Sequence, residues 1–162
     1  MANILVIHGP NLNLLGTREP DIYGRTTLND INTRIYNIAR QHGAEVSCFQ
    51  SNSEGEIINI IHRESENADC IILNPGAYTH YSIAIADALK AVNVPAIEVH
   101  LTNIFGREEF RRTSVVAPAV VGQISGFGYF SYQLAVYAAV NIIKQNEKDR
   151  MEETKAGKTK RL

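Results

Sequence analysis

Short, mostly apolar runs recur along the chain and are separated by longer stretches in which polar residues are frequent. The runs are rich in β-branched side chains and show no strict alternation with polar positions. A continuous run of this kind is typical of a strand that is covered on both faces of a sheet. The pattern therefore predicts five buried strands, within Ile4–Ile7, Val46–Phe49, Cys70–Leu73, Ala96–Val99 and Val120–Ile124.

The stretches between the runs carry helical periodicity, with apolar residues every three or four positions and capping residues ahead of them. They predict helices over Thr27–His42, Ser53–Asn67, Thr79–Val92 and Ser131–Gln145. Strands that alternate with helices form a parallel sheet with right-handed crossovers. We expect an α/β fold of the flavodoxin-like kind: a five-stranded parallel sheet in the order 2-1-3-4-5, with helices on both faces.

Residues 1–148 are expected to form one domain, and the charged tail over residues 149–162 is expected to be disordered because it has almost no large apolar side chain. Seven of the 16 Lys and Arg residues lie from Lys144 onward, which leaves nine basic and thirteen acidic residues in the body. A mildly acidic body argues against a nucleic-acid partner.

No apolar stretch approaches membrane-spanning length and the N-terminus has no signal-peptide pattern, so we expect a cytoplasmic protein that does not enter a membrane. Cys48 and Cys70 lie far apart in apolar runs without metal-ligand spacing. The loop after the first strand, HGPNLNLLG, lacks both GxxxxGK[ST] and GxGxxG. We therefore expect no metal and no nucleotide cofactor.

Polar residues gather where the predicted strands end, which is where ligands bind in sheets of this class. His8–Gly24 follows the first strand, Asn74–Ser82 follows the third, and Glu98–Asn103 ends the fourth. An arginine group follows, formed by Arg107, Arg111 and Arg112. These segments are expected to converge on one cleft.

Two pairs in these segments can supply acid–base chemistry. Arg18 and Tyr23 lie five residues apart in a long loop, and a guanidinium beside a phenol lowers a pKa that is normally near ~10. Taken alone, an arginine stacked on an exposed ring is the commoner arrangement. Glu98 and His100 point to the same face of a strand and are both expected to face the cleft. A carboxylate favours the protonated imidazole, which suits a general acid, although a paired surface histidine is an equal alternative.

A third group is suited to binding a polyhydroxylated acid. Asn74 begins an NPG turn, His80 is expected to lie at the start of a helix, and Asp87 follows two turns later on the same face. Taken alone, Asp87 is most simply a solvent-exposed residue of a helix, and Asn11 is most simply a residue that favours a turn.

Four blocks of the chain resemble the type II 3-dehydroquinate dehydratases: HGPNLNLLGTREPDIYG, SNSEGEII, ILNPGAYTHYSIAIADAL and EVHLTNIFGREEFRR. The resemblance runs from about Asn3 to Ile143. It implies a hydro-lyase that converts 3-dehydroquinate reversibly to 3-dehydroshikimate through an enolate, without Schiff base, metal or cofactor. The reaction would be the third step of the shikimate pathway, in aromatic amino acid biosynthesis, or part of quinate catabolism. The resemblance also implies a homododecamer, a tetramer of trimers.

The resemblance further implies residue roles. Tyr23 matches the base and Arg18 the residue that activates it and stabilises the developing charge. Asn11 matches the residue that holds a water against the enolate oxygen. His100 matches the acid, oriented by Glu98. The substrate-binding set is Asn74, His80, Asp87, Leu101, Thr102 and Arg111.

Some alternatives stay open. Thr102 stands where the family commonly has serine, and Arg112 beside Arg111 leaves the contacting arginine undecided by spacing. A Schiff-base mechanism has little support, because Lys90 on a helix face is the only lysine of the body. A flavin- or phosphate-binding module on the same fold and a non-catalytic scaffold are the two rival functions.

Overall fold

The computed structural model of the chain describes residues 1–159, except for the side chains of Tyr23 and of residues 157–159. Strands and helices alternate along it as the sequence predicts. The strands are β1 (Ala2–His8), β2 (Ala44–Gln50), β3 (Cys70–Asn74), β4 (Ala96–His100) and β5 (Gly122–Ser125). The helices are α1 (Pro20–Tyr23), α2 (Leu28–Gln41), α3 (Glu54–Glu64), α4 (Ile83–Ala91) and α5 (Phe130–Thr159).

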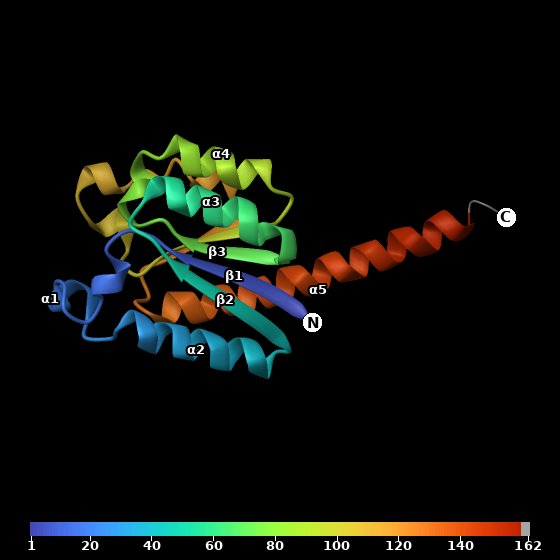
Figure 1. Cartoon of the computed structure of the whole chain (residues 1–162), viewed down its shortest axis with the longest axis horizontal. Helices are drawn as coiled ribbons and strands as arrows, with labels where there is room; N and C mark the ends of the chain where they lie inside the picture. The colour runs from blue at the N-terminus through green and yellow to red at the C-terminus, as the bar shows by residue number, and fades with distance from the viewer. Residues whose placement is uncertain (160–162) are drawn as a thin grey trace.

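The five strands form one sheet in the order β2-β1-β3-β4-β5, and every neighbouring pair is parallel. This arrangement confirms the predicted fold class and strand order (Figure 1). The register places His8 at the end of β1 opposite Asn74 at the end of β3, and His100 at the end of β4 opposite Ser125. The ends of the central strands therefore bring residues from distant parts of the chain to one edge of the sheet.

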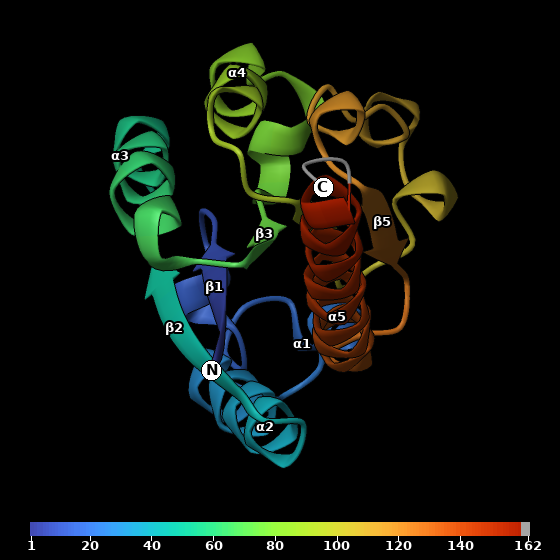
Figure 2. The same ribbon diagram turned by 90° about the vertical axis from the view of Figure 1, so that its right-hand side faces the viewer.

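Successive strand residues point to opposite faces, and both faces are covered (Figure 2). Ile4 and Val6 pack with α2 and α5 in one buried cluster, whereas Leu5 and Ile7 pack with α3 and α4 in another. In the central strands β1, β3 and β4 the absence of alternation follows from this double burial, since neither face can accept a row of polar side chains. The expectation of five buried strands is wrong for β2 and β5, which are partly exposed because they lie at the edges of the sheet.

Helix α4 begins later than its sequence predicts. A 3-10 turn, η3 (Gly76–His80), follows β3, and α4 starts at Ile83 with the Ser82 side chain accepting a hydrogen bond from the Ile85 N–H group at 3.1 Å. His80 therefore ends η3, and the expectation that it opens a helix is wrong. The reason is that Ser82 supplies the helix cap.

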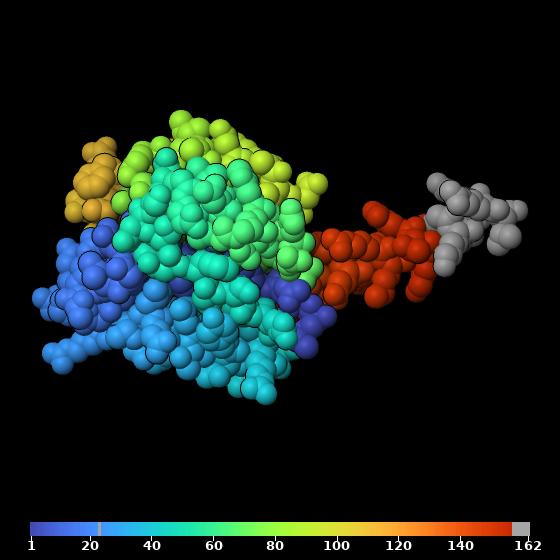
Figure 3. Space-filling view, viewed as in Figure 1, coloured from blue at the N-terminus to red at the C-terminus, as the bar shows by residue number. Residues whose placement is uncertain are grey.

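Helix α5 differs from the expectation of a disordered tail, because it continues to Thr159 and projects away from the body (Figures 1 and 3). Its exposed part is rich in Glu and Lys, which favour helix without tertiary packing. Side-chain bonds along the helix support it, from Gln145 to Asp149 at 2.9 Å and from Thr154 to the Arg150 carbonyl at 2.8 Å. Residues 160–162 lie outside the described part of the chain, and the boundary at residue 148 stays a prediction.

Candidate active site

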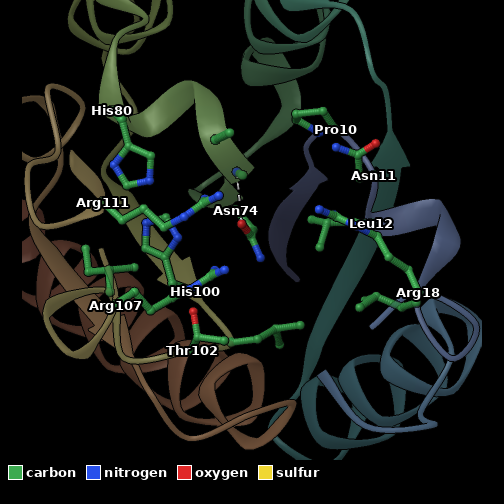
Figure 4. Close-up of a pocket in the computed structure, with 15 residues that line it drawn as sticks. Pro10, Asn11, Leu12, Arg18, Asn74, His80, His100, Thr102, Arg107 and Arg111 are labelled. Carbon is green, nitrogen blue, oxygen red and sulfur yellow. Dashed lines mark hydrogen bonds between the residues drawn. The ribbon is translucent and has the colours of Figure 1, made fainter. Parts of the chain in front are cut away.

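A pocket of about 110 Å³ lies at the carboxyl ends of the central strands. Figure 4 shows Asn11 and Arg18 on one side of it, His80, His100 and Arg111 on the other, and Asn74 between them. Eight of the eleven site residues predicted from the sequence line the pocket: Asn11, Arg18, Asn74, His80, His100, Leu101, Thr102 and Arg111. The convergence expected from the strand ends is therefore confirmed.

The loops after β1 and β3 approach each other very closely at the floor of the pocket. The Gly9 N–H group donates to the Asn74 carbonyl at 2.7 Å, and a Cβ at position 9 would lie 2.7 Å from that oxygen. Asn11, two residues further on, has a left-handed backbone with φ 68°. Its N–H group donates to the Asn52 side chain at 2.9 Å, so the loop is fixed at the pocket rim.

Arg18 reaches the pocket from the long loop after β1. Its guanidinium lies 3.6 Å from the Glu19 carboxylate, and 39% of its side chain is exposed. Glu19 adopts a left-handed backbone with φ 42° immediately before the short helix α1. The backbone of Tyr23 ends α1, but its side chain lies outside the described residues. The pairing of Arg18 with Tyr23 therefore stays a prediction.

Glu98 and His100 form a buried hydrogen-bonded pair with 2.6 Å between Oε1 and Nε2. His100 lines the pocket, whereas Glu98 is fully buried and lies behind it. The expectation that both side chains face the cleft is therefore right for His100 and wrong for Glu98. Hydrogen-bond donors inside the protein surround the Glu98 carboxylate and take the place of water.

Opposing effects determine the ionisation of Glu98. Burial alone would raise the pKa of its carboxyl group, because a buried charge loses its hydration. Hydrogen bonds from His100, Thr79 and Ser114, together with the charge of His100, outweigh burial and lower the pKa below its ordinary value. Glu98 is thus a carboxylate at neutral pH and accepts the Nε2–H group of His100. This leaves the other ring nitrogen of His100, Nδ1, for a ligand.

Two polar side chains on the β3 side are held by backbone contacts. The Asn74 side-chain oxygen accepts the Gly76 N–H group at 3.1 Å, which leaves its NH₂ group for other partners. Nδ1 of His80 lies 2.8 Å from the Thr113 carbonyl and therefore donates to it. Nε2 of His80 is then the nitrogen that remains for a ligand.

Asp87 does not line the pocket of its own chain. It lies on an exposed face of α4, beyond the turn that carries His80. The two residues do not share a helix face, because α4 begins only at Ile83. Asp87 is the one predicted substrate-binding residue that the fold leaves outside the pocket.

The segment after β4 supplies the remaining polar wall. Arg111 lines the pocket with its guanidinium held 3.0 Å from Glu108 and 4.9 Å from the Phe110 ring centre, whereas Arg112 is exposed and does not line it. Arg111 is therefore the one of the two adjacent arginines that lines the pocket, and its contact with the substrate stays a prediction. Arg107 also lines the pocket, although the sequence indicated it only as part of an arginine group.

Sequence reasoning missed the apolar part of the lining, since ordinary core residues carry no chemical signal. These residues pack beside the polar groups and exclude water from them: Pro10, Leu12, Leu15, Ala77 and Ile104. Among the lining residues that the structure describes there are three arginines and two histidines but no Asp or Glu. The pocket is therefore suited to an anion.

Within the described part of the chain, no three His, Cys, Asp or Glu side chains are grouped so that they could hold a metal ion. No helix among residues 1–159 is long and apolar enough to cross a membrane.

Comparison with known proteins identifies the family. Residues 2–140 match the family described as dehydroquinase class II. The chain is 60% identical over 144 residues to the 3-dehydroquinate dehydratase of Caldicellulosiruptor saccharolyticus, covering 88% of this chain and 99% of that protein. The type II dehydroquinase structure from Butyrivibrio crossotus superposes with a TM-score of 0.83 at 47% identity, covering 85% of this chain and 97% of that one. The structure from Propionibacterium acnes superposes with a TM-score of 0.84 at 44% identity, covering 87% and 97%. This chain belongs to the dehydroquinase class II family.

Proposed function

We propose that this protein is a hydro-lyase that converts 3-dehydroquinate to 3-dehydroshikimate, the reaction for which its relatives are named. The observation that carries the proposal is the buried Glu98–His100 pair at the wall of a cationic pocket. An elimination needs an acid for the departing hydroxyl, and the carboxylate behind the imidazole fixes the orientation of His100 for this role. The arginines can bind the substrate's carboxylate and stabilise negative charge that develops during the reaction.

In the proposed reaction, the Tyr23 phenolate removes a proton from the carbon beside the ketone and an enolate forms. Arg18 stabilises the phenolate and the developing negative charge. The enolate then returns its electrons to form the conjugated double bond. The hydroxyl group leaves as water with a proton from His100. Asn11 holds a water molecule against the enolate oxygen before this collapse.

The remaining residues of the site bind the substrate in this proposal. The backbone at Leu101 and Thr102 holds the carboxylate, and three pocket side chains contact the ring hydroxyls: Asn74, His80 and Arg111. The added methyl of Thr102, relative to the serine common in the family, leaves its hydroxyl available. Asp87 would have to reach the substrate from a neighbouring protomer, since it lies outside its own pocket.

We further propose that the protein forms a homododecamer, a tetramer of trimers, in the cytoplasm. Large apolar side chains around the pocket support an assembly: Tyr81, Ile83, Phe105 and Phe110 have between 59% and 66% of their surface exposed. Exposed apolar residues that lie close together commonly mark protein interfaces. Light scattering of the purified protein tests this proposal, and a mass corresponding to a single chain would contradict it.

Addition of 3-dehydroquinate to the purified protein tests the proposed reaction. We expect the ultraviolet absorbance of the conjugated enone to grow, and borohydride to leave the activity intact because no Schiff base forms. No absorbance change at any substrate concentration would contradict the reaction and favour a scaffold. A yellow protein with bound flavin would favour the rival cofactor-binding function.

A further inference from the structure

The carboxylate of Glu98 receives a full set of hydrogen bonds in the interior of the protein. Oε1 accepts from Nε2 of His100 and from the Thr79 hydroxyl. Oε2 accepts from the Ser114 hydroxyl at 2.9 Å and from the Gln123 side-chain NH₂ group at 2.7 Å. An ionised carboxylate has about four lone-pair sites, so these four donors saturate it.

A saturated carboxylate has no place for a proton. If Glu98 became a neutral acid, its O–H group would need an acceptor. The Gln123 NH₂ group can only donate, and the Thr79 or Ser114 hydroxyl would have to give up its own bond to the carboxylate in order to accept. A buried donor that faces another donor is strongly unfavourable. The arrangement therefore selects the ionised form of Glu98 through geometry, in addition to the attraction of the imidazole.

The three neutral donors come from different segments, and each segment is itself anchored. The Val115 N–H group donates to the Thr79 carbonyl at 2.8 Å, which ties the segment of Ser114 to η3. The Ala117 N–H group donates to the Ser114 oxygen at 2.9 Å, so that the serine hydroxyl proton is available to Glu98. Gln123 lies directly opposite Glu98 in the β4–β5 register.

We propose that Thr79, Ser114 and Gln123 are positioning residues for the acid step, because they keep Glu98 a carboxylate that holds Nε2–H of His100 and leaves Nδ1 to protonate the leaving hydroxyl. This inference rests on the proposed function, which assigns the acid to His100. None of the three residues lines the pocket, so they act on the substrate only through Glu98 and His100.

The charged side chains around the pocket explain why Glu98 has to be kept ionised by these three donors. The other charged or titratable side chains of the pocket among the described residues are Arg18, His80, Arg107 and Arg111. Positive groups near an imidazole oppose its protonated form. A Glu98 that lost its charge would leave the acid without compensation, and the proton of the pair would no longer be held on the imidazole.

Steady-state kinetics of three variants provides the first test: Thr79→Val, Ser114→Ala and Gln123→Leu. We expect each to lower kcat by about tenfold, as loss of one charge-assisted hydrogen bond predicts, and to leave KM within about twofold. Thr79→Ser keeps the hydroxyl and should retain the wild-type kcat. Ser65→Ala is the matched control, because the Ser65 hydroxyl also donates one partly buried bond, to the His62 carbonyl, far from the pocket.

Infrared spectroscopy provides a second test that needs no substrate. Because its pKa is lowered, the buried carboxylic-acid band of Glu98 should appear at a lower pH than that of an ordinary glutamate in the wild-type protein, and at higher pH in Thr79→Val and Ser114→Ala. Unchanged kcat in all three donor variants, or a band that does not shift, would overturn the positioning role. A wild-type protein that does not turn over 3-dehydroquinate would instead overturn the proposed function, and the infrared shift would separate the two failures.

Discussion

The hydroxyl of Tyr132 lies 2.8 Å from Nδ1 of His8, and both side chains are completely buried between the sheet and α5. The other ring nitrogen of His8, Nε2, lies 2.8 Å from the side-chain oxygen of Asn32 and must donate to it. Nδ1 therefore accepts the Tyr132 hydroxyl proton, and His8 is a neutral imidazole. Burial lowers its pKa to about 4 despite the hydrogen bond that it donates to Asn32, and burial also raises the pKa of Tyr132.

The neutral His8 should make the protein less stable in mild acid. Between about pH 6.5 and pH 4 the unfolded chain binds a proton at this residue and the folded chain does not, so the free energy of unfolding falls as the pH falls through this range. The lowered pKa of His8 predicts that the free energy of unfolding falls by about 3 kcal/mol across this range, and that this group causes no further decrease below pH 4. Denaturant unfolding at a series of pH values measures it. In His8→Asn the new side chain does not titrate, so the free energy of unfolding should fall less over the same pH range. An equal decrease in both proteins would contradict the conclusion that His8 is neutral in the folded protein.

Removal of the Tyr132 hydroxyl should destabilise the protein without changing the shape of the core. Tyr132→Phe leaves Nδ1 of His8 without its donor, and a buried unsatisfied acceptor costs about 1–3 kcal/mol. Tyr137→Phe on the same helix is the matched control, because Tyr137 is exposed, and its effect should stay within about 0.5 kcal/mol. Thermal or denaturant unfolding compares the two, and equal stabilities would argue against the buried bond.

Tyr23→Phe should abolish most of the activity if Tyr23 is the base. Positioned acid–base groups contribute about 10²–10⁴-fold to a rate, so kcat should fall by that factor while the fold is retained. The measurement is the growth of enone absorbance, with Tyr36→Phe on α2, which does not line the pocket, as the control. Near wild-type turnover in Tyr23→Phe would show that another group removes the proton.

Arg111 and Arg112 are adjacent in the sequence but should differ in function. Arg111→Ala removes a guanidinium from the pocket wall, and the loss of one or two charge-assisted bonds should lower kcat/KM by about 10- to 100-fold. Arg112→Ala changes an exposed arginine outside the pocket and should leave kcat/KM within about twofold of the wild type. A larger effect at position 112 than at 111 would contradict the assignment of the contacting arginine.

Gly9→Ala should damage both stability and activity. The new Cβ would lie 2.7 Å from the backbone of Asn74 and Pro75, which cannot yield as a flexible side chain can. We expect a loss of about 1–3 kcal/mol in stability and a displaced loop at the pocket. Gly55→Ala in the first turn of α3 has only a 3.9 Å contact and should instead gain up to about 1 kcal/mol. Denaturant unfolding and turnover, measured on both variants, test these two expectations.

The sequence predicts the sheet and most of the pocket because both depend on patterns that are local in the chain. Doubly covered strands leave continuous apolar runs, and the rule that ligands bind at the carboxyl ends of parallel strands then places Asn74 and His100 together. The burial of Glu98 was not predictable in this way. Its donors Thr79, Ser114 and Gln123 are far apart in the sequence, and none of them is unusual in its own segment.

Two other differences between the sequence predictions and the structure, at the start of α4 and in the tail, have local physical causes. The sequence places the start of α4 too early, because both Thr79 and Ser82 are acceptable helix caps and only the three-dimensional fold selects Ser82. The tail after Lys148 has almost no large apolar residue, which favours disorder, yet most of its residues have high helix propensity. A helix that extends from a packed segment avoids the cost of nucleation, so propensity alone can continue it.

The projecting part of α5 offers a site for chemical labelling that is distant from the pocket. Helix α5 projects from the side of the body opposite α1 (Figure 1), whereas the pocket is lined by the strand ends and by Arg18 just before α1. A cysteine introduced in the projecting part by Glu152→Cys would be the reactive thiol of the described chain, since Cys70 is buried, Cys48 is half-buried, and burial raises their pKa values to about 12 and about 11. A dye or a solid support could thus be attached to the helix while the pocket stays open to solution.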